Sequence, residues 1–189
     1  MSIDTNEMPR TIHEGKYLRM VVRGRWEYVE RTHAAGLAVV ILALTPDDRA
    51  LFVEQFRVPL GRNVIEWPAG LVGDIDAEES LELSAARELE EETGWRPARC
   101  QVLLLGATSA GMSSERAAFV RATGLTKIHD GGGDATENIV VHAIPRRDAA
   151  RWLAQKQAEG CELDLKLWSG LWLLDHALDG SPLAHVAAD

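Results

Sequence analysis

The chain has 189 residues, of which 46% are hydrophobic and 26% charged, enough for one domain with a substantial core. Its net charge of −9 excludes the broad basic surface that binds nucleic-acid backbones, so we expect no nucleic-acid partner. The longest apolar run is shorter than the roughly 20 residues that span a bilayer, and no hydrophobic signal segment opens the chain, so we expect no membrane contact and a cytoplasmic location.

Short apolar–polar alternation and one long apolar run predict strands in the first part of the chain. Residues 1 to about 15 are interpreted as a loose lead-in. The predicted strands are 17–22, 26–31, 34–44, 50–57 and 64–67. The run 34–44 is interpreted as a buried central strand, and a turn at Thr45-Pro46-Asp47-Asp48 predicts that 50–57 pairs with it as a hairpin.

A helix rich in Ala, Leu and Glu is predicted at 77–93, with Thr93-Gly94 as its end. The remaining predicted elements are strands at 101–105, 116–122 and 138–144 and helices at 147–159 and 163–178. Trp67, Trp168 and Trp172 are expected in the core, and Cys100 and Cys161 are expected as reduced thiols. This order predicts an α+β fold, an α/β/α sandwich in which a mixed sheet lies between helices. Because no linker divides the chain, 1–189 is expected to be one domain with a frayed tail at 180–189.

Three carboxylates crowd one edge of the helix predicted at 77–93. Glu88 and Glu92 are i,i+4 neighbours and Glu91 lies three residues after Glu88, so like charges should destabilise the helix. Arg87 can reach Glu91 at i+4, which leaves the other two carboxylates free. A solvated acidic face is the ordinary interpretation of such a helix. The alternative is that the carboxylates bind a hard divalent cation such as Mg²⁺, which takes oxygen ligands and would offset their repulsion.

The spacing around these acids favours the metal. The pattern G-x5-E-x7-R-E-U-x-E-E-x-G-U, with U bulky and apolar, is matched by Gly73, Glu79, Arg87, Glu88, Leu89, Glu91, Glu92, Gly94 and Trp95. Seven fixed letters at about 7% each give roughly a 10⁻⁸ chance per start position. The stretch resembles the Nudix box. The resemblance implies Mg²⁺, with Mn²⁺ as a substitute, held by Glu88 and Glu92, with Glu91 near the ions as a catalytic group and Arg87 and Glu79 bracing them.

The segment before the box resembles the ADP-ribose pyrophosphatase branch of that family. Glu66-Trp67-Pro68-Ala69-Gly70 is similar to its E-x-P-A-G motif, which implies that the Ala69 carbonyl is a metal ligand and Glu66 a substrate-side carboxylate. Arg57 matches a position that contacts substrate phosphates; a surface arginine in a strand pair is the alternative. Either Gly73 is the box glycine, or it is Gly70 followed by a three-residue insertion, which we favour.

Three further candidates lie outside the box. Glu115, in T-S-A-G-M-S-S-E-R, matches a substrate- or metal-contacting position, and Glu137 matches a catalytic loop glutamate, with Asp134 as the alternative. For both, a solvated loop acid is the competing interpretation. Trp26, in R-W-E-Y-V-E-R-T, resembles a tryptophan that stacks on adenine, although a core or interface role is also open. Residues 1–32 would then lie in the interface of a homodimer.

The resemblance implies an Mg²⁺-dependent hydrolase that cleaves ADP-ribose or a related nucleoside diphosphate sugar, a small-molecule substrate. A GDP-mannose-type sugar nucleotide is the close competitor. The alternative from another class is a non-catalytic, ligand-sensing Nudix module. Retention of Glu88, Glu91 and Glu92 favours catalysis.

Overall fold

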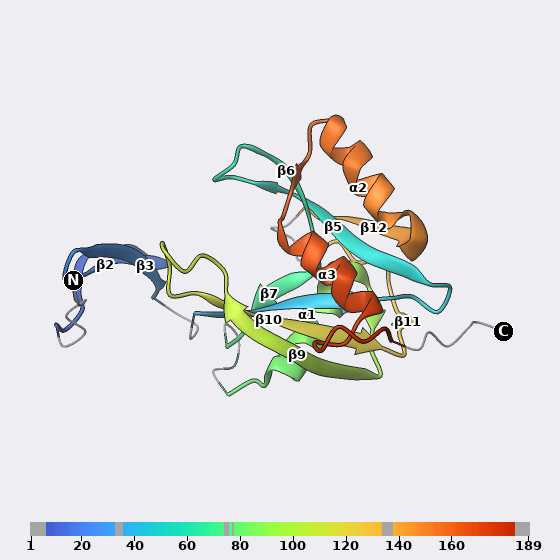
Figure 1. Cartoon of the computed structure of the whole chain (residues 1–189), viewed down its shortest axis with the longest axis horizontal. Coiled ribbons are helices and arrows are strands. Elements are labelled where there is room, and N and C mark those ends of the chain that lie inside the picture. The colour runs from blue at the N-terminus through green and yellow to red at the C-terminus, as the bar shows by residue number, and fades with distance from the viewer. Residues whose placement is uncertain (1–6, 33–35, 74–75, 77, 134–137, 184–189) are drawn as a thin grey trace.

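A computed structural model describes residues 7–32, 36–73, 76, 78–133 and 138–183. The chain forms a small N-terminal sheet that projects from a larger body of strands and three α-helices (Figure 1). The projecting sheet is antiparallel, in the order β1 (Arg10–Glu14), β2 (Leu18–Arg23) and β3 (Trp26–Arg31). The two strands expected near residues 17–31 are confirmed. The loose lead-in is wrong for Arg10–Glu14, an exposed strand without the burial pattern that would reveal it in sequence.

Two four-stranded sheets form the body. The first has the order β7-β4-β10-β9 and consists of β7 (Ala69–Leu71), β4 (Leu37–Ala43), β10 (Arg116–Thr123) and β9 (Arg99–Ala107). The second has the order β12-β5-β6-β13 and consists of β12 (Val140–Pro145), β5 (Arg49–Arg57), β6 (Arg62–Glu66) and β13 (Glu162–Leu163). A short pair joins β8 (Trp95–Arg96) and β11 (Thr126–Lys127). Because β4 runs parallel to β10 and antiparallel to β7, the first sheet is mixed, as predicted.

The predicted hairpin of β4 and β5 is wrong. After the turn the two strands share one isolated bridge, between Leu44 and Ala50, and then diverge into different sheets. The hydrogen-bonding edges of β4 are taken by β7 and β10, and those of β5 by β6 and β12. Sequence proximity favours a hairpin, but both strands are central strands of separate sheets.

The helices are α1 (Leu81–Thr93), α2 (Ala149–Ala158), preceded by a 3₁₀ turn η1 (Arg146–Asp148), and α3 (Lys166–Asp175). The α1 helix begins four residues later than predicted because the Ser80 side chain caps it, accepting a hydrogen bond from the Leu83 N–H at 3.3 Å. It ends as predicted at Gly94, whose left-handed φ of 73° suits glycine. Among the described residues, no helix is long and apolar enough to cross a membrane.

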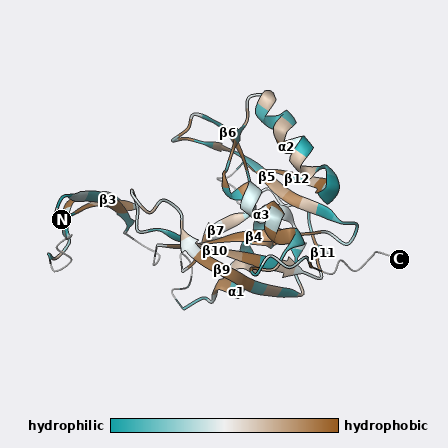
Figure 2. Ribbon diagram, viewed as in Figure 1, coloured by the Kyte–Doolittle hydropathy of each residue, from teal (hydrophilic) through white to brown (hydrophobic). Residues whose placement is uncertain are grey.

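Strand β4 separates two hydrophobic clusters. Its side chains alternate, so Val40 and Leu42 pack with Trp67 and α3, whereas Val39 and Ile41 pack with α1. Figure 2 shows hydrophobic residues running along β4 and β10 between the helices. The observed layers agree with the predicted α+β class. Cys100 and Cys161, near these clusters, are free thiols as predicted.

The expectation for the C-terminal tryptophans is wrong. Trp67 is buried at 2% exposure, but Trp168 and Trp172 are each 44% exposed. The buried face of α3 is formed instead by Leu167, Leu173 and other small or aliphatic residues. Trp172 stacks on His176 with 4.8 Å between ring centroids, so its ring supports the segment that follows α3.

A polar cluster around Glu54 joins β5, β6, β12 and α2. The carboxylate accepts hydrogen bonds from Asn63 (2.9 Å) and Lys156 (3.2 Å) and lies 2.9 Å from the His142 Nε2. Burial by itself raises the pKa of Glu54, but these donors outweigh it and lower the pKa to about 2.

We therefore expect Glu54→Gln to destabilise the fold by about 3 kcal/mol at neutral pH. Because the pKa of Glu54 is about 2 in the folded state and near 4.5 in the unfolded state, its contribution is complete above about pH 4.5. The contribution is lost as the pH falls through about 2. Urea unfolding of wild type and variant at pH 7, 5 and 3 should show a difference that shrinks at low pH. Glu159→Gln, which removes only the more exposed partner of Lys156, is the control, and a pH-independent difference would contradict the prediction.

Candidate functional site

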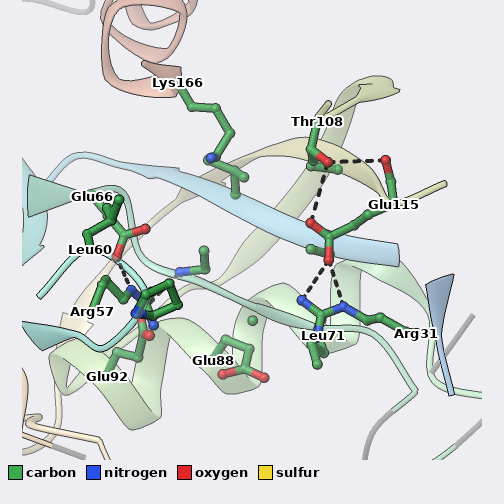
Figure 3. Close-up of a pocket in the computed structure, with 16 residues that line it drawn as sticks. Arg31, Arg57, Leu60, Glu66, Leu71, Glu88, Glu92, Thr108, Glu115 and Lys166 are labelled. Atoms are coloured by element: carbon green, nitrogen blue, oxygen red, sulfur yellow. Dashed lines mark hydrogen bonds and ion pairs between the residues drawn. The ribbon is translucent and has the colours of Figure 1, made fainter. Parts of the chain in front are cut away.

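A cleft of about 660 Å³ brings together most of the residues selected from the sequence. Six of them line it: Arg57, Glu66, Ala69, Glu88, Glu92 and Glu115. They are far apart in sequence, since β5, β6, β7, α1 and the residue just before β10 all contribute. Figure 3 shows the Arg57–Glu66 pair on one side, the Arg31–Glu115 pair on the other, and Glu88 between them.

Gly70 on β7 makes room for Glu88. A Cβ atom at Gly70 would lie 2.0 Å from Glu88 Cδ, so the Glu88 carboxyl occupies the space that any other residue would fill. The neighbouring Ala69 N–H donates to Glu92 Oε2 at 3.1 Å, and Glu92 is only 4% exposed. Gly70 is thus in contact with a box carboxylate. Gly73 has a φ of 79° in the turn beyond β7.

Arg87 braces the acidic helix from outside the cleft lining. Its guanidinium pairs with Glu79 at 3.2 Å and with Glu91 at 3.0 Å, the i+4 contact that helical spacing predicts. It also pairs with Glu88 at 2.9 Å, so the expectation that Arg87 leaves the other carboxylates free is wrong for Glu88. Burial by itself lowers the pKa of Arg87, but Glu79, Glu88 and Glu91 raise it overall. Arg87 therefore remains charged and offsets part of the like-charge repulsion on α1.

Arg57 and Glu66 are paired with each other across the β5–β6 sheet. Arg57 Nε donates to Glu66 Oε2 at 2.6 Å. Val53 is the register partner of Glu66, and Arg57 lies four residues further along β5 on the same face, so the two side chains reach over the intervening Gln55–Val64 pair. Gln55 is buried beneath them, and among the described residues its Oε1 has no hydrogen-bond partner. A substrate phosphate that attracts Arg57 would compete with Glu66 for the guanidinium.

On the other side of the cleft, Arg31 pairs with Glu115, and the sequence predicted only the second of these two residues. Arg31, at the end of β3, donates to Glu115 Oε2 at 2.6 Å, and Thr108 donates to the Glu115 carbonyl at 3.2 Å. Glu115 was selected from the sequence, but Arg31 was not, although it lies in the same R-W-E-Y-V-E-R-T segment as Trp26. Lys166, at the start of α3, also lines the cleft and pairs with Asp164. No local motif marks Lys166, so only the fold reveals it.

Trp26 does not line the cleft. It lies on β3, 42% exposed, and lines a separate hollow of about 300 Å³ with Tyr28, Ser113 and Ser114. The two hollows are linked by neighbouring residues, because Ser114 lines this hollow and the next residue, Glu115, lines the cleft. Within one copy of the described chain, the predicted base platform and the predicted phosphate contacts are thus in neighbouring hollows.

The loop candidates Glu137 and Asp134 lie outside the described residues. The start of their loop is anchored to the C-terminal end of α1, where the N–H groups of Gly132 and Gly133 donate to the carbonyls of Glu92 (2.8 Å) and Glu91 (3.1 Å). A Cβ atom at Gly131 would lie 2.5 Å from the Glu92 carbonyl oxygen, so this close approach requires glycine.

The donor set suits a hard cation that keeps water and substrate ligands. Within the part of the chain that the structure describes, no three His, Cys, Asp or Glu side chains converge to hold an ion by themselves. Glu88 and Glu92 both line the cleft beside Ala69, and the space at Gly70 lets Glu88 approach the β7 backbone. Because Mg²⁺ commonly takes one or two carboxylates and completes its shell with waters and phosphate oxygens, these residues fit it.

Comparison with known proteins shows which domain family and which fold this chain is similar to. Residues 34–169 match the NUDIX domain family. The chain is 32% identical over 121 residues to a methanol dehydrogenase activator of Bacillus methanolicus, covering 64% of each chain. It is 35% identical over 138 residues to an ADP-ribose pyrophosphatase of Escherichia coli K12, covering 69% of this chain and 64% of that one. The crystal structure of an ADP compounds hydrolase superimposes with a TM-score of 0.68 at 19% identity, covering 88% of this chain and 89% of that one, and shows the same fold.

Proposed function

This chain belongs to the Nudix family, and from that membership we propose that it is an Mg²⁺-dependent pyrophosphatase acting on ADP-ribose or a related nucleoside diphosphate sugar. The products would be a nucleoside monophosphate and a sugar phosphate. The observation that carries the proposal is the cleft, in which Glu88 and Glu92 lie between two arginine–glutamate pairs. Carboxylates for a cation and arginines for phosphate oxygens are what a charged diphosphate requires.

Glu88, Glu92 and the Ala69 carbonyl would hold the Mg²⁺, with Glu91 nearby. When bound, the ion supplies charge neutralisation at the phosphoryl oxygens and lowers the pKa of bound water. Arg57 would bind a phosphate oxygen and release Glu66 to the substrate side, while Arg87 keeps Glu91 oriented. Glu137 would accept the proton of the attacking water, with Asp134 as the alternative, and Glu115 would contact the substrate from the other wall.

The same cleft is compatible with two other functions. A GDP-mannose-type sugar nucleotide shares the diphosphate, so the cleft acids and arginines serve it equally. A ligand-sensing module is the other alternative, and similarity to a protein named as an activator of methanol dehydrogenase keeps a regulatory role in view. The ADP-ribose pyrophosphatase named for the E. coli relative favours catalysis.

A substrate panel separates these functions. Purified protein is incubated with ADP-ribose, GDP-mannose, UDP-glucose, a dinucleotide and ATP, with Mg²⁺ or with EDTA, and nucleoside monophosphate is quantified. We expect Mg²⁺-dependent release of AMP from ADP-ribose at the highest kcat/KM. Ligand binding without turnover of any compound would favour the sensing module, and preferential cleavage of ATP would contradict the proposed substrate class.

A homodimer formed through the N-terminal sheet is part of the proposal. The sheet projects from the body (Figure 1) and carries large exposed apolar side chains, including Ile12, Leu18, Met20 and Trp26. Among the described residues, its contacts with the body include the Val29 backbone bonds to the 112–114 turn and the Arg31–Glu115 pair. A second copy would cover this apolar surface and could bring Trp26 to a cleft.

We expect Trp26→Ala to raise the KM for ADP-ribose about tenfold with little change in kcat, since stacking on a base contributes about 1–3 kcal/mol. Steady-state kinetics check this. Trp168→Ala, which removes an equally exposed tryptophan from α3, is the matched control and should leave both constants near wild type. Equal effects of the two substitutions would assign Trp26 a purely structural role.

A further inference from the structure

Another hollow, of about 370 Å³, lies at the far end of β10 and α3 from the cleft. Its polar lining residues are Gln101, Arg121 and His176, and its apolar lining includes Leu103, Leu178 and Leu183. Strand β10 contributes Ala117 to the cleft and Arg121 to this hollow, and α3 contributes Lys166 to the cleft and Leu173 to the hollow. The two hollows share no lining residue, so a ligand in one does not contact the other.

Arg121 carries a partly buried charge without a carboxylate partner among the described residues. Among these residues its side chain donates one hydrogen bond, from Nη2 to the Leu173 carbonyl at 2.5 Å. Burial lowers the pKa of Arg121, and no neighbouring charge among the described residues raises it. Arg146 shows the contrast, because Asp48 and Asp175 both pair with it and raise its pKa overall despite burial.

This lack of a counter-ion is unusual in an acidic chain. The protein has 29 Asp and Glu residues against 20 Lys and Arg, yet none of the described acids is paired with Arg121. The Leu173 carbonyl belongs to the last turns of α3, whose partial negative charge offsets only part of a guanidinium charge. A guanidinium has five N–H donors in a planar fork that matches a carboxylate or phosphate group, and a buried charge left without such a partner is costly.

We propose that this hollow binds a small organic anion. The carboxylate or phosphate group lies on Arg121, beside Gln101, its register partner on β9. The apolar body of the ligand packs against Leu103, Leu178 and Leu183. The site is independent of the proposed hydrolysis and would exist in a catalytically inactive protein.

Calorimetric titration with hexanoate, hexyl phosphate, 1-hexanol and hexylammonium tests the anion requirement. We expect binding of hexanoate or hexyl phosphate at least tenfold tighter than binding of the neutral or cationic compound, because an anionic head group accepts charge-assisted hydrogen bonds from a guanidinium. The four compounds carry apolar chains of five or six carbons, so they differ mainly in the head group. The tighter of the two anions identifies the head group. Equal affinity for hexanol or hexylammonium would overturn the proposal.

Three variants locate the binding. Arg121→Gln should weaken the anion at least tenfold, whereas Arg57→Gln, which removes a cleft arginine, should leave its affinity unchanged. If Arg121→Gln does not fold, Leu178→Trp keeps Arg121 and adds bulk to the lining of the hollow at a position that is 59% exposed, so it should weaken anion binding. Loss of binding in Arg57→Gln together with full binding in Leu178→Trp would place the anion in the cleft and overturn the proposal.

Discussion

Glu92→Gln and Glu88→Gln each lower kcat for ADP-ribose by about 10³-fold or more, with thermal stability in metal-free buffer unchanged or slightly raised. Loss of a transition-state charge interaction in a shielded site has effects of this size. We expect no net loss of stability, because relief of the repulsion between these i,i+4 neighbours offsets the Arg87–Glu88 ion pair that Glu88→Gln removes. Glutamine also keeps an oxygen that can accept the Ala69 N–H, now bonded to Glu92 at 3.1 Å.

Thermal unfolding with and without Mg²⁺ gives a second measurement that does not depend on turnover. The ion stabilises any folded protein that binds it, so the melting temperature of wild type rises with Mg²⁺ and that of either variant rises less. Glu90→Gln is the matched control, since Glu90 is on the same helix but pairs with Arg96 at 2.6 Å on the surface. A kcat within tenfold of wild type in Glu92→Gln would contradict the proposal that the carboxylates of α1 bind the catalytic metal ion.

Gly70→Ala abolishes most of the activity, by at least about 100-fold, while the protein remains folded. The added Cβ would lie 2.0 Å from Glu88 Cδ and 2.2 Å from its Oε1, so the Glu88 carboxyl has to leave its position. The displaced atoms belong to a flexible side chain, and Gly→Ala reduces the freedom of the unfolded chain, so we expect little loss of stability. Steady-state kinetics and urea unfolding measure the two effects separately.

Gly106→Ala provides the control for adding a methyl group to a strand. The nearest atom to its new Cβ is Leu104 Cδ1 at 3.9 Å, an ordinary contact, so activity should persist. A double-mutant cycle tests the mechanism, because Gly70→Ala in the Glu88→Gln background should cause little further loss if both act through one carboxylate. Additive losses would mean that Gly70 matters for a reason other than Glu88.

Local patterns predicted most elements because each pattern reports a local property. The apolar run at 34–44 corresponds to the buried strand β4, and Gly94 ends α1 as its left-handed conformation requires. Pairing was less predictable. The predicted hairpin of β4 and β5 is wrong because β4 pairs with β10 and β5 pairs with β12, partners that lie about 80 or more residues away in the chain.

Which side chains of a helix are exposed depends on how the helix packs against its neighbours, and the sequence alone did not predict this for α3. Trp168 and Trp172 have the apolar character of core residues, yet α3 buries Leu167 and Leu173 instead. A helix presents one stripe to its neighbours, and its rotation is set by the sheet beneath it.

The sequence by itself determined the chemistry of the proposed site: carboxylates at Glu88 and Glu92 at helical spacing, an arginine at position 57, and a glycine at position 70. Only the tertiary structure decided that Gly70 lies against Glu88, that Arg57 is held by Glu66, and that Arg31 and Lys166 line the same cleft. The physical reason is that residue type and spacing fix what a side chain can bind. Which side chains share a cleft depends on contacts between strands and helices that are distant in the chain.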